Sequence, residues 1–386
     1  MGLKNETSSS YNTKAFYKEY VEGMDSRELG KQLQSDSERL KKLYKDALTQ
    51  RIPKNTSPDE IPFTQKALSL ISALTKRLNP IRRLIFGISI VAFLSHYLLS
   101  IVGLSGFVLH PLLLPVSFIG ILLILLIELL EKSDFQKELD FARDIQLSLL
   151  PASMRSAPQL EIFSFAATAR EVGGDYVDII KTEKGTYVII ADVSGKGMSA
   201  ALYMVRIQAL VHLIINKLHP SPKELFLELN DYIKSNKKDK TFITACAVYF
   251  PHNEDYFTLA RAGHNIPLVY NRERDTTYKI KSDGFALGMT TTANLRKTLT
   301  EKRYHFQEGD SLLLYTDGLV EARNDLNEEY GIERLDGLFS IYGSLRAKTI
   351  TQKIQMSLEV FMGDENLADD ITFTTIHKLP KPKRIS

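Results

Sequence analysis

Two stretches in the first third of the chain contain no charged side chain, and each is long enough to cross a bilayer as a helix. They cover residues 84–104 and 108–127, and neither includes Asp, Glu, Lys or Arg. A transmembrane helix needs roughly 20 consecutive apolar residues, whereas a helix on a soluble core is apolar on one face only. We therefore expect a two-span transmembrane hairpin over 84–127. The alternative is a pair of helices buried in a soluble core.

The charges around these stretches predict how the hairpin is oriented. The connection between them has no Lys or Arg, and neither has the start of the second stretch, which contains His110 and Pro111. Basic residues flank both outer ends instead, namely Lys76, Arg77, Arg82, Arg83, Lys132 and Lys137. Cytoplasmic flanks of membrane spans carry this excess of positive charge. The pattern predicts a multi-pass protein of the cytoplasmic membrane, with both termini in the cytoplasm.

Helical patterns are expected on both sides of the hairpin. Residues 1–80 form a predicted cytoplasmic helical region, with one helix beginning near Asp25 and a second at about 63–78. Residues 128–150 are expected to form a linker helix that ends at Pro151. One stripe of this helix is apolar, and consists of Phe135, Leu139, Ala142, Ile145 and Leu149. The stripe fits either packing on the following domain or a short parallel coiled coil, which would make the chain a homodimer.

Residues 151–386 show a different sequence pattern, which predicts a domain of strands and helices. Short β-rich runs separated by turns predict strands at Tyr187–Ala191, Phe242–Phe250, Tyr256–Arg261, Pro267–Tyr270, Ser311–Tyr315 and Ile371–Ile376. Helical patterns cover Ala200–Lys217, Pro222–Lys234 and Ala347–Phe361. Because strands and helices do not alternate regularly, the pattern favours an α+β domain with antiparallel sheets.

Composition and cysteine content exclude two further classes. The formal net charge is only +3, and no basic stripe is interleaved with aromatic residues, so we expect no nucleic-acid partner. The single cysteine, Cys246, lies inside an apolar run. It cannot form an internal disulfide, and we expect a buried strand residue rather than a nucleophile.

Four short segments place aspartates at the end of an apolar run, next to a glycine or to a second aspartate. They contain Asp175, Asp192, Asp317 and the pair Asp369 and Asp370. One such aspartate is usually a turn residue, but carboxylates that converge at about 4 Å would repel by roughly 4 kcal/mol at an effective dielectric near 20. Hard divalent cations remove that repulsion, and oxygen ligands favour Mg²⁺ or Mn²⁺ over zinc. Two such ions can activate a water for attack on a phosphoryl group. The residues alone therefore predict a two-metal hydrolase.

Six motifs follow one another in the same part of the chain. They are REVGGDYVD at 170–178, DVSGKGMSAAL at 192–202, FITA at 242–245, AGH at 262–264, GDSLLLYTDGLVEA at 309–322 and ADDIT at 368–372. Their order resembles that of the SpoIIE/RsbU branch of the PPM (type 2C) protein phosphatases. The segment 142–151 is similar to the helix that leads into that domain. The resemblance covers about residues 141–379 and nothing before about residue 128.

The resemblance implies a fold and an activity. The fold would be an αββα sandwich, in which two antiparallel sheets are flanked by helices, with two Mn²⁺ or Mg²⁺ ions at one end of the sheets. The activity would be that of a bacterial serine/threonine protein phosphatase, acting on phosphoserine or phosphothreonine of a regulatory protein without a phosphoenzyme. Such a substrate is often an anti-sigma-factor antagonist.

The same resemblance assigns metal ligands motif by motif. Asp192 should bridge both ions, with the carbonyl of Val193 as a backbone ligand. Asp317 and Asp369 should hold one or both ions, and Asp175 should complete the cluster. The neighbouring Asp370 corresponds to a more peripheral polar residue.

Four further residues of these motifs bear on phosphate binding and acid catalysis, and three of them have two interpretations. Arg170 lies five residues before Asp175, where type 2C enzymes place a phosphate-binding arginine, but it could also be a solvated charge at a strand end. Ser194 stands where many type 2C enzymes have a histidine, so no general acid is identified. Lys196 could assist phosphate binding, although we favour a role in covering a glycine turn. We likewise favour a structural role for His264 over that of an acid.

Two other enzyme classes are excluded and one non-enzymatic alternative stays open. Gly-Gly-Asp at 173–175 also opens the signature of diguanylate cyclases, but Tyr176 and Val177 follow where Glu and Phe are needed. Gly195-Lys196-Gly197 lacks the earlier glycine and the following Ser or Thr of a nucleotide P-loop. The open alternative is a catalytically silent membrane scaffold that uses the same fold as a binding module.

Overall fold

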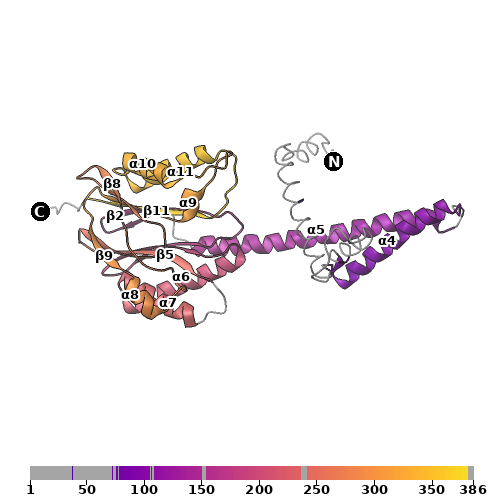
Figure 1. The fold of residues 1–386 in the computed structure, drawn as a ribbon, viewed down its shortest axis with the longest axis horizontal. Coiled ribbons are helices and arrows are strands. Elements are labelled where there is room, and N and C mark those ends of the chain that lie inside the picture. The colour runs from indigo at the N-terminus through magenta and orange to yellow at the C-terminus, as the bar shows by residue number, and fades with distance from the viewer. Residues whose placement is uncertain are drawn as a thin grey trace, which may run out of the picture. The chain divides into compact units, whose positions relative to one another are not determined.

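The computed structural model describes residues 78–104, 106, 108–149, 154–235 and 241–380, together with 37, 72, 75 and 76. It divides into two compact units, Met1–Ser133 and Asp134–Ser386, whose elements are labelled in Figure 1. The helices predicted before residue 78 lie almost entirely outside the described residues.

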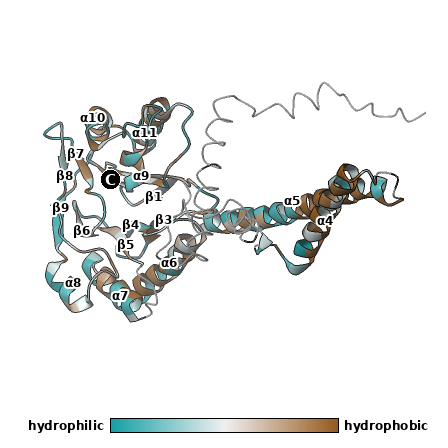
Figure 2. Ribbon diagram, turned by 45° about the vertical axis from the view of Figure 1, so that its right-hand side comes forward, coloured by the Kyte–Doolittle hydropathy of each residue, from teal (hydrophilic) through white to brown (hydrophobic). Residues whose placement is uncertain are grey.

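The first unit contains two long apolar helices that run side by side. Helix α4 covers Pro80–Ile101 and helix α5 begins at His110 and continues to Leu149 in the second unit. Proline at the first position of α4 suits a helix start, since its missing N–H would have no partner there. Figure 2 shows α4 and the facing part of α5 as hydrophobic, and the remainder of α5 as largely hydrophilic.

Small residues bring the two helices together. Ser89, Ala92 and Ser117 are buried, and a Cβ atom on Gly120 would collide with the side chain of Ser89. Close packing of small residues is typical of helix pairs in membranes. The outward faces carry large exposed apolar side chains, including Leu94, Leu98, Phe118, Ile119 and Leu122.

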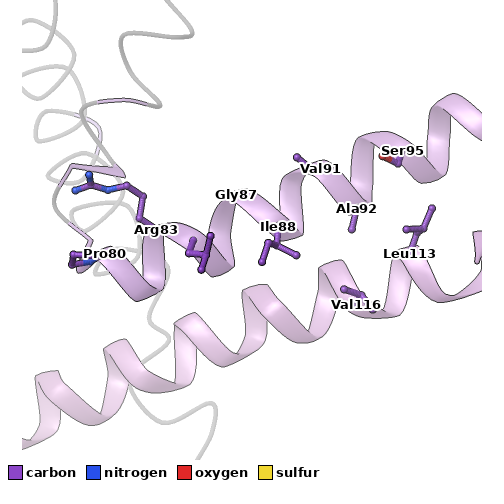
Figure 3. Close-up of a pocket in the computed structure, with 10 residues that line it drawn as sticks. Pro80, Arg83, Gly87, Ile88, Val91, Ala92, Ser95, Leu113 and Val116 are labelled. Atoms are coloured by element: carbon purple, nitrogen blue, oxygen red, sulfur yellow. The ribbon is translucent and has the colours of Figure 1, made fainter.

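Polar contacts join α4 and α5 near both ends of the helix pair. At one end Arg82, on α4, forms ion pairs with Glu128 and Glu131 on α5, at 2.9 Å for Glu128. At the other end the ring of His96 stacks on that of His110 with centroids 4.3 Å apart. Between the ends, a groove of about 770 Å³ follows one face of α4 from Pro80 to Ser95 and is bordered by Leu113 and Val116 (Figure 3).

The second unit contains two antiparallel sheets. One has the strand order β3-β4-β5-β6-β9, and the other the order β1-β2-β11-β10-β7-β8. The strands of the first are Asp175–Lys181, Gly185–Val193, Ile243–Pro251, Tyr256–Ala262 and Glu301–His305. Those of the second, in the same spatial order, are Met154–Ala157, Leu160–Ala167, Ile371–Lys378, Ser311–Tyr315, Leu268–Asn271 and Thr276–Lys279.

Helices cover the outer face of each sheet (Figure 1). On the five-stranded side these are α6 (Met198–Leu218), α7 (Pro222–Ser235) and α8 (Thr292–Thr298), and on the six-stranded side α9 (Asp317–Glu321), α10 (Ile332–Tyr342) and α11 (Ala347–Met362). Strand β4 shows why three layers of core result. Val188 and Ile190 belong to the core between the sheets, whereas Tyr187 and Ile189 pack under α6 and α7, as the two-residue period of a strand requires.

The predicted αββα sandwich is confirmed. Each of the six predicted strands and three predicted helices lies on an observed element of the same type, and Cys246 is buried. The predicted position at the end of an apolar strand was wrong for three aspartates: Asp175 begins β3 and is buried, and Asp369 and Asp370 precede β11. Five observed strands were not predicted, namely β1, β2, β3, β8 and β9. In β8 and β9 the many polar and exposed residues give no apolar alternation.

Three described helices are long and apolar enough to cross a membrane, by length and composition: Pro80–Ile101, His110–Gln146 and Met198–Leu218. The third is α6, whose buried side includes Met204, Ile207 and Val211 against the five-stranded sheet. The compatibility of α4 and α5 with a membrane agrees with the sequence prediction of apolar spans.

Candidate active site

The predicted aspartates gather where strands of both sheets end. Asp175 and Asp192 lie opposite each other in the pairing of β3 with β4, and Asp192 is in turn opposite Thr244 of β5. Thr316, at the end of β10, donates a hydrogen bond of 2.8 Å to Oδ2 of Asp175. This bond connects the two sheets directly at the site.

Glycines allow the turns that carry these aspartates to approach one another. A Cβ atom on Gly318 would collide with the backbone carbonyl of Asp370, so the turn after β10 packs directly on the turn before β11. A Cβ atom on Gly173 would lie only 2.6 Å from Oδ2 of Asp370. Only glycine fits such close approaches, and they bring Asp317 and Asp369 to the same end of the sandwich as Asp192.

The carboxylates are close enough to disturb one another's protonation. Burial, and then the charges of Asp317, Asp369 and Asp370, raise the pKa of Asp192 to about 7. Burial and the charge of Asp369 raise the pKa of Asp317, and burial together with Asp192 raises that of Asp175 well above its usual value. Carboxylates held together in this way favour the uptake of either protons or cations.

The oxygen atoms of these residues suit hard divalent cations, although the described side chains are not already arranged as a complete ligand set. Among the described residues, no three His, Cys, Asp or Glu side chains are already arranged to hold one ion. The acids that converge offer only oxygen, which suits Mg²⁺ or Mn²⁺. The carbonyl oxygen of Val193 lies 3.1 Å from the position that a Cβ on Gly174 would take, so this predicted backbone ligand faces the same turn as Asp175.

Asp370 has a different environment from the other acids. Its Oδ1 accepts a hydrogen bond from the N–H of Ala169 at 2.9 Å, and its Oδ2 accepts one from Gly174 at 2.7 Å. These bonds attach the segment around Arg170 to the turn before β11. The geometry indicates a carboxylate that shapes the site, in keeping with its predicted peripheral position.

The remaining residues of the motifs are placed as follows. A terminal nitrogen of Arg170 lies 3.6 Å from where a Cβ of Gly197 would be, at the turn that follows Asp192. Ser194 Oγ accepts a hydrogen bond of 2.8 Å from the N–H of Phe242, so it fastens that turn to β5. His264 is buried and shares a hydrogen bond with Thr244. Burial and Arg261 lower the pKa of His264 to about 3, which leaves the ring neutral and favours the structural role.

Sequence reasoning missed a contact made by the linker helix. Gln146 of α5 is buried, and its amide forms two hydrogen bonds with the backbone of Gly173, one donated at 2.6 Å and one accepted at 3.0 Å. Gly173 is two residues before Asp175. The available signal was a glutamine next to the apolar stripe. If such a side chain is buried, it is nearly always hydrogen-bonded.

Asp178, three residues after Asp175, belongs to a separate cluster. Its carboxylate accepts hydrogen bonds from the hydroxyl of Tyr176 and the N–H of Ile179, and it contacts Nε2 of His212 at 2.6 Å. The side chain is buried, and both of its carboxylate oxygens have partners. The structure thus separates Asp178 from the converging acids.

Comparison with known proteins agrees with this arrangement. The sequence profile of the family "Stage II sporulation protein E (SpoIIE)" matches residues 182–378. The phosphoserine phosphatase RsbU of Bacillus subtilis (strain 168) is 28% identical over 250 residues, which cover 64% of this chain and 72% of that protein.

Solved structures show the same fold. The SiaA-PP2C domain of Pseudomonas aeruginosa superposes with a TM-score of 0.56 at 17% identity, over 65% of this chain and 99% of that one. The RsbU and RsbW domains of a Mycobacterium tuberculosis protein superpose with a TM-score of 0.50 at 22% identity, over 58% of this chain and 62% of that one. The predicted enzyme class is confirmed, and metal dependence is general for this class. The chain belongs to the SpoIIE family, and it is a serine/threonine phosphatase of the metal-dependent PPM type.

Proposed function

We propose that this chain is a membrane-anchored phosphatase that removes phosphate from phosphoserine or phosphothreonine of a regulatory protein, using two Mn²⁺ or Mg²⁺ ions. The observation that carries the proposal is the convergence of Asp175, Asp192, Asp317 and Asp369, whose charges act on one another. The name of the 28% identical relative, a phosphoserine phosphatase, supports this substrate class.

The roles of the chain's own residues follow from their positions. Asp192 is the central acid, and with the Val193 carbonyl it would hold both ions. Asp317 and Asp369 would hold them from the turns of the opposite sheet, and Asp175 would be oriented by Thr316. Bound divalent cations supply an activated water and a Lewis acid for the phosphoryl oxygens.

Substrate phosphate and leaving group would meet different residues. Arg170 reaches the turn after Asp192 with its guanidinium and would bind the phosphate, since planar guanidinium groups match phosphate oxygens. Ser194 is engaged with Phe242 and His264 is buried and neutral. We therefore assign the proton of the leaving hydroxyl to solvent.

The hairpin would anchor this enzyme in the cytoplasmic membrane. We propose that α4 and the first part of α5 both span the bilayer and that both termini are cytoplasmic. The exposed apolar faces of the two helices support insertion. The basic residues outside the spans, Arg83 and Lys132 among them, support the orientation. Residues 1–80 and 151–386 would then share the cytoplasm.

Regulation would act through the linker helix. We propose that 128–150 forms a homodimer whose geometry sets activity. Phe135 and Ile145 of its apolar stripe are exposed, and Gln146 contacts the turn before Asp175. Each fully buried side chain would stabilise the dimer by about 1.5–3 kcal/mol. Replacing Leu139 and Ile145 with Asp should abolish self-association and change turnover; if both stay as in the parent, the helix is a passive linker.

Phosphate release from a phosphoserine peptide by the full chain in detergent tests the activity. We expect release in the presence of Mn²⁺ and none after chelation. A protein that binds the peptide but never releases phosphate would be the silent scaffold instead. The regulatory protein itself, which we propose is an anti-sigma-factor antagonist, can be found by comparing phosphopeptides of cells with and without this chain.

A further inference from the structure

Lys196 makes a contact that its place in a glycine turn does not explain. Its Nζ lies 2.6 Å from Oδ2 of Asp369 and donates a hydrogen bond of 3.1 Å to the carbonyl of Ala368. Gly195 and Gly197 on either side have φ values of 108° and 75°, a region that favours glycine. This turn sends the lysine across to the segment before β11 instead of letting it cover its own glycines.

The contact uses the carboxylate oxygen of Asp369 that does not accept the hydrogen bond from the next residue. Oδ1 of Asp369 accepts a hydrogen bond of 3.0 Å from the N–H of Asp370. Oδ2 is the atom that the Lys196 ammonium contacts. Because Asp369 is expected to bind a divalent cation, that cation and the lysine compete for the same carboxylate.

The ammonium also acts on the other acids of the cluster. Its charge opposes the effects that raise the pKa values of Asp192 and Asp317. Lys196 is therefore a positive charge placed among three carboxylates, each of which is a predicted metal ligand. Its own side chain is 47% exposed, so it can leave the cluster without crossing the protein core.

We propose that Lys196 is a built-in counter-ion that occupies the cation position at Asp369 and must be displaced when a divalent metal binds there. This inference rests on the proposed two-metal function of the same acids. The lysine lets the empty site fold without repulsion among its carboxylates, and it weakens metal binding in return. Lys196 is then a positioning residue that sets the metal concentration at which the enzyme becomes active.

Two measurements on the full chain in detergent test the proposal. The first is the Mn²⁺ affinity of the parent and of Lys196→Met, which keeps side-chain length and removes the charge, from the electron paramagnetic resonance signal of free Mn²⁺. We expect the variant to bind Mn²⁺ roughly two- to fivefold more tightly, the scale of a half-exposed ion pair. Lys196→Arg, which keeps the charge, should bind like the parent.

The second measurement is thermal stability with and without Mn²⁺. Lys196→Met should melt at a lower temperature than the parent in chelator, because the acids lose their counter-ion, and should gain more from Mn²⁺. A merely structural lysine would lower both melting temperatures alike. Arg323 supplies the matched control, since it borders the same small pocket as Lys196 but pairs with Glu329, and Arg323→Met should leave Mn²⁺ affinity unchanged.

The outcomes separate this inference from the proposed function. If the parent binds Mn²⁺ in a manner that Asp192→Asn abolishes, but Lys196→Met binds no more tightly, the counter-ion role is wrong and the metal site stands. If Asp192→Asn makes no difference to Mn²⁺ binding, the metal site and the counter-ion role both fail.

Discussion

The hairpin helices and the phosphatase domain each contain groups in an environment that does not suit them. Helices α4 and α5 expose large apolar side chains, whereas the domain brings together acids such as Asp175 and Asp192 in partly or fully buried positions. Exposed apolar surface and convergent carboxylates are both unfavourable in water alone. The comparison is in keeping with our proposal that both regions bind something outside the chain, lipid in one case and divalent cations in the other.

Helix α6 sharpens this comparison, because by length and composition it too could cross a membrane, although its mean hydropathy is below that of α4 and of α5. Of its most apolar window 39% is buried inside the protein, against 11% for α4 and 6% for α5. Met204 and Val211 of α6 pack on the five-stranded sheet. An apolar helix thus needs no lipid where a sheet covers it, whereas the described residues bury much less of α4 and α5.

The largest expected effect comes from removing one central carboxylate. Asp192→Asn should lower turnover of a phosphoserine peptide by about 10³-fold or more, or roughly 4 kcal/mol of transition-state stabilisation, because the expected bridge between two cations is lost. Membrane association should be the same as that of the parent. Steady-state kinetics and membrane fractionation of the same preparation measure both.

A charge placed in the hairpin should affect membrane insertion of the hairpin and not the phosphatase domain. Arginine near the centre of a span costs about 2.5–3.5 kcal/mol of insertion free energy, so Ile121→Arg should reduce the membrane-bound fraction. Ile341 of α10, an isoleucine that is 71% exposed, is the control: Ile341→Arg should leave the membrane-bound fraction unchanged.

Reporter fusions at Gly106 and Ser386 should lie on opposite sides of the membrane. Reporters on one side would contradict the hairpin.

The acids predict a pH dependence of stability that metal should remove. The pKa of Asp192 is raised to about 7 in the folded chain, against about 3.9 for an unfolded aspartate. Between these values the folded state binds more protons, so the contribution of Asp192 to stability is most favourable below about pH 4 and falls until about pH 7. The melting temperature of the metal-free domain should decrease over this range, and Asp192→Asn should flatten the decrease. A melting temperature that rises with pH in chelator would contradict the assignment.

Sequence and structure agree best where the signal is local. The apolar run Tyr187–Ala191 and the uncharged length of 84–104 are such signals, and both predicted their elements. The aspartates could be selected because each lies beside an apolar run and near a glycine or a second aspartate. The partners of these groups could not be foreseen, because Gln146 with Gly173 and Lys196 with Asp369 are separated by 27 and 173 positions that only the fold brings together.

We expect the smallest effect on turnover from replacing Asp178. Unlike the converging acids, this buried carboxylate does not need a cation. This carboxylate is buried like that of Asp175 and on the same strand. Its charge is instead met inside the chain, by Tyr176, Ile179 and His212. Asp178→Asn should therefore change turnover by less than about threefold and leave Mn²⁺ affinity unaltered, while the lost charge-assisted bonds lower stability by about 1–3 kcal/mol. Asp175→Asn is the matched comparison, since it should weaken Mn²⁺ binding. If Asp178→Asn instead weakens Mn²⁺ binding as much as Asp175→Asn, the two acids form one site, and the separation between internally and externally completed carboxylates does not hold.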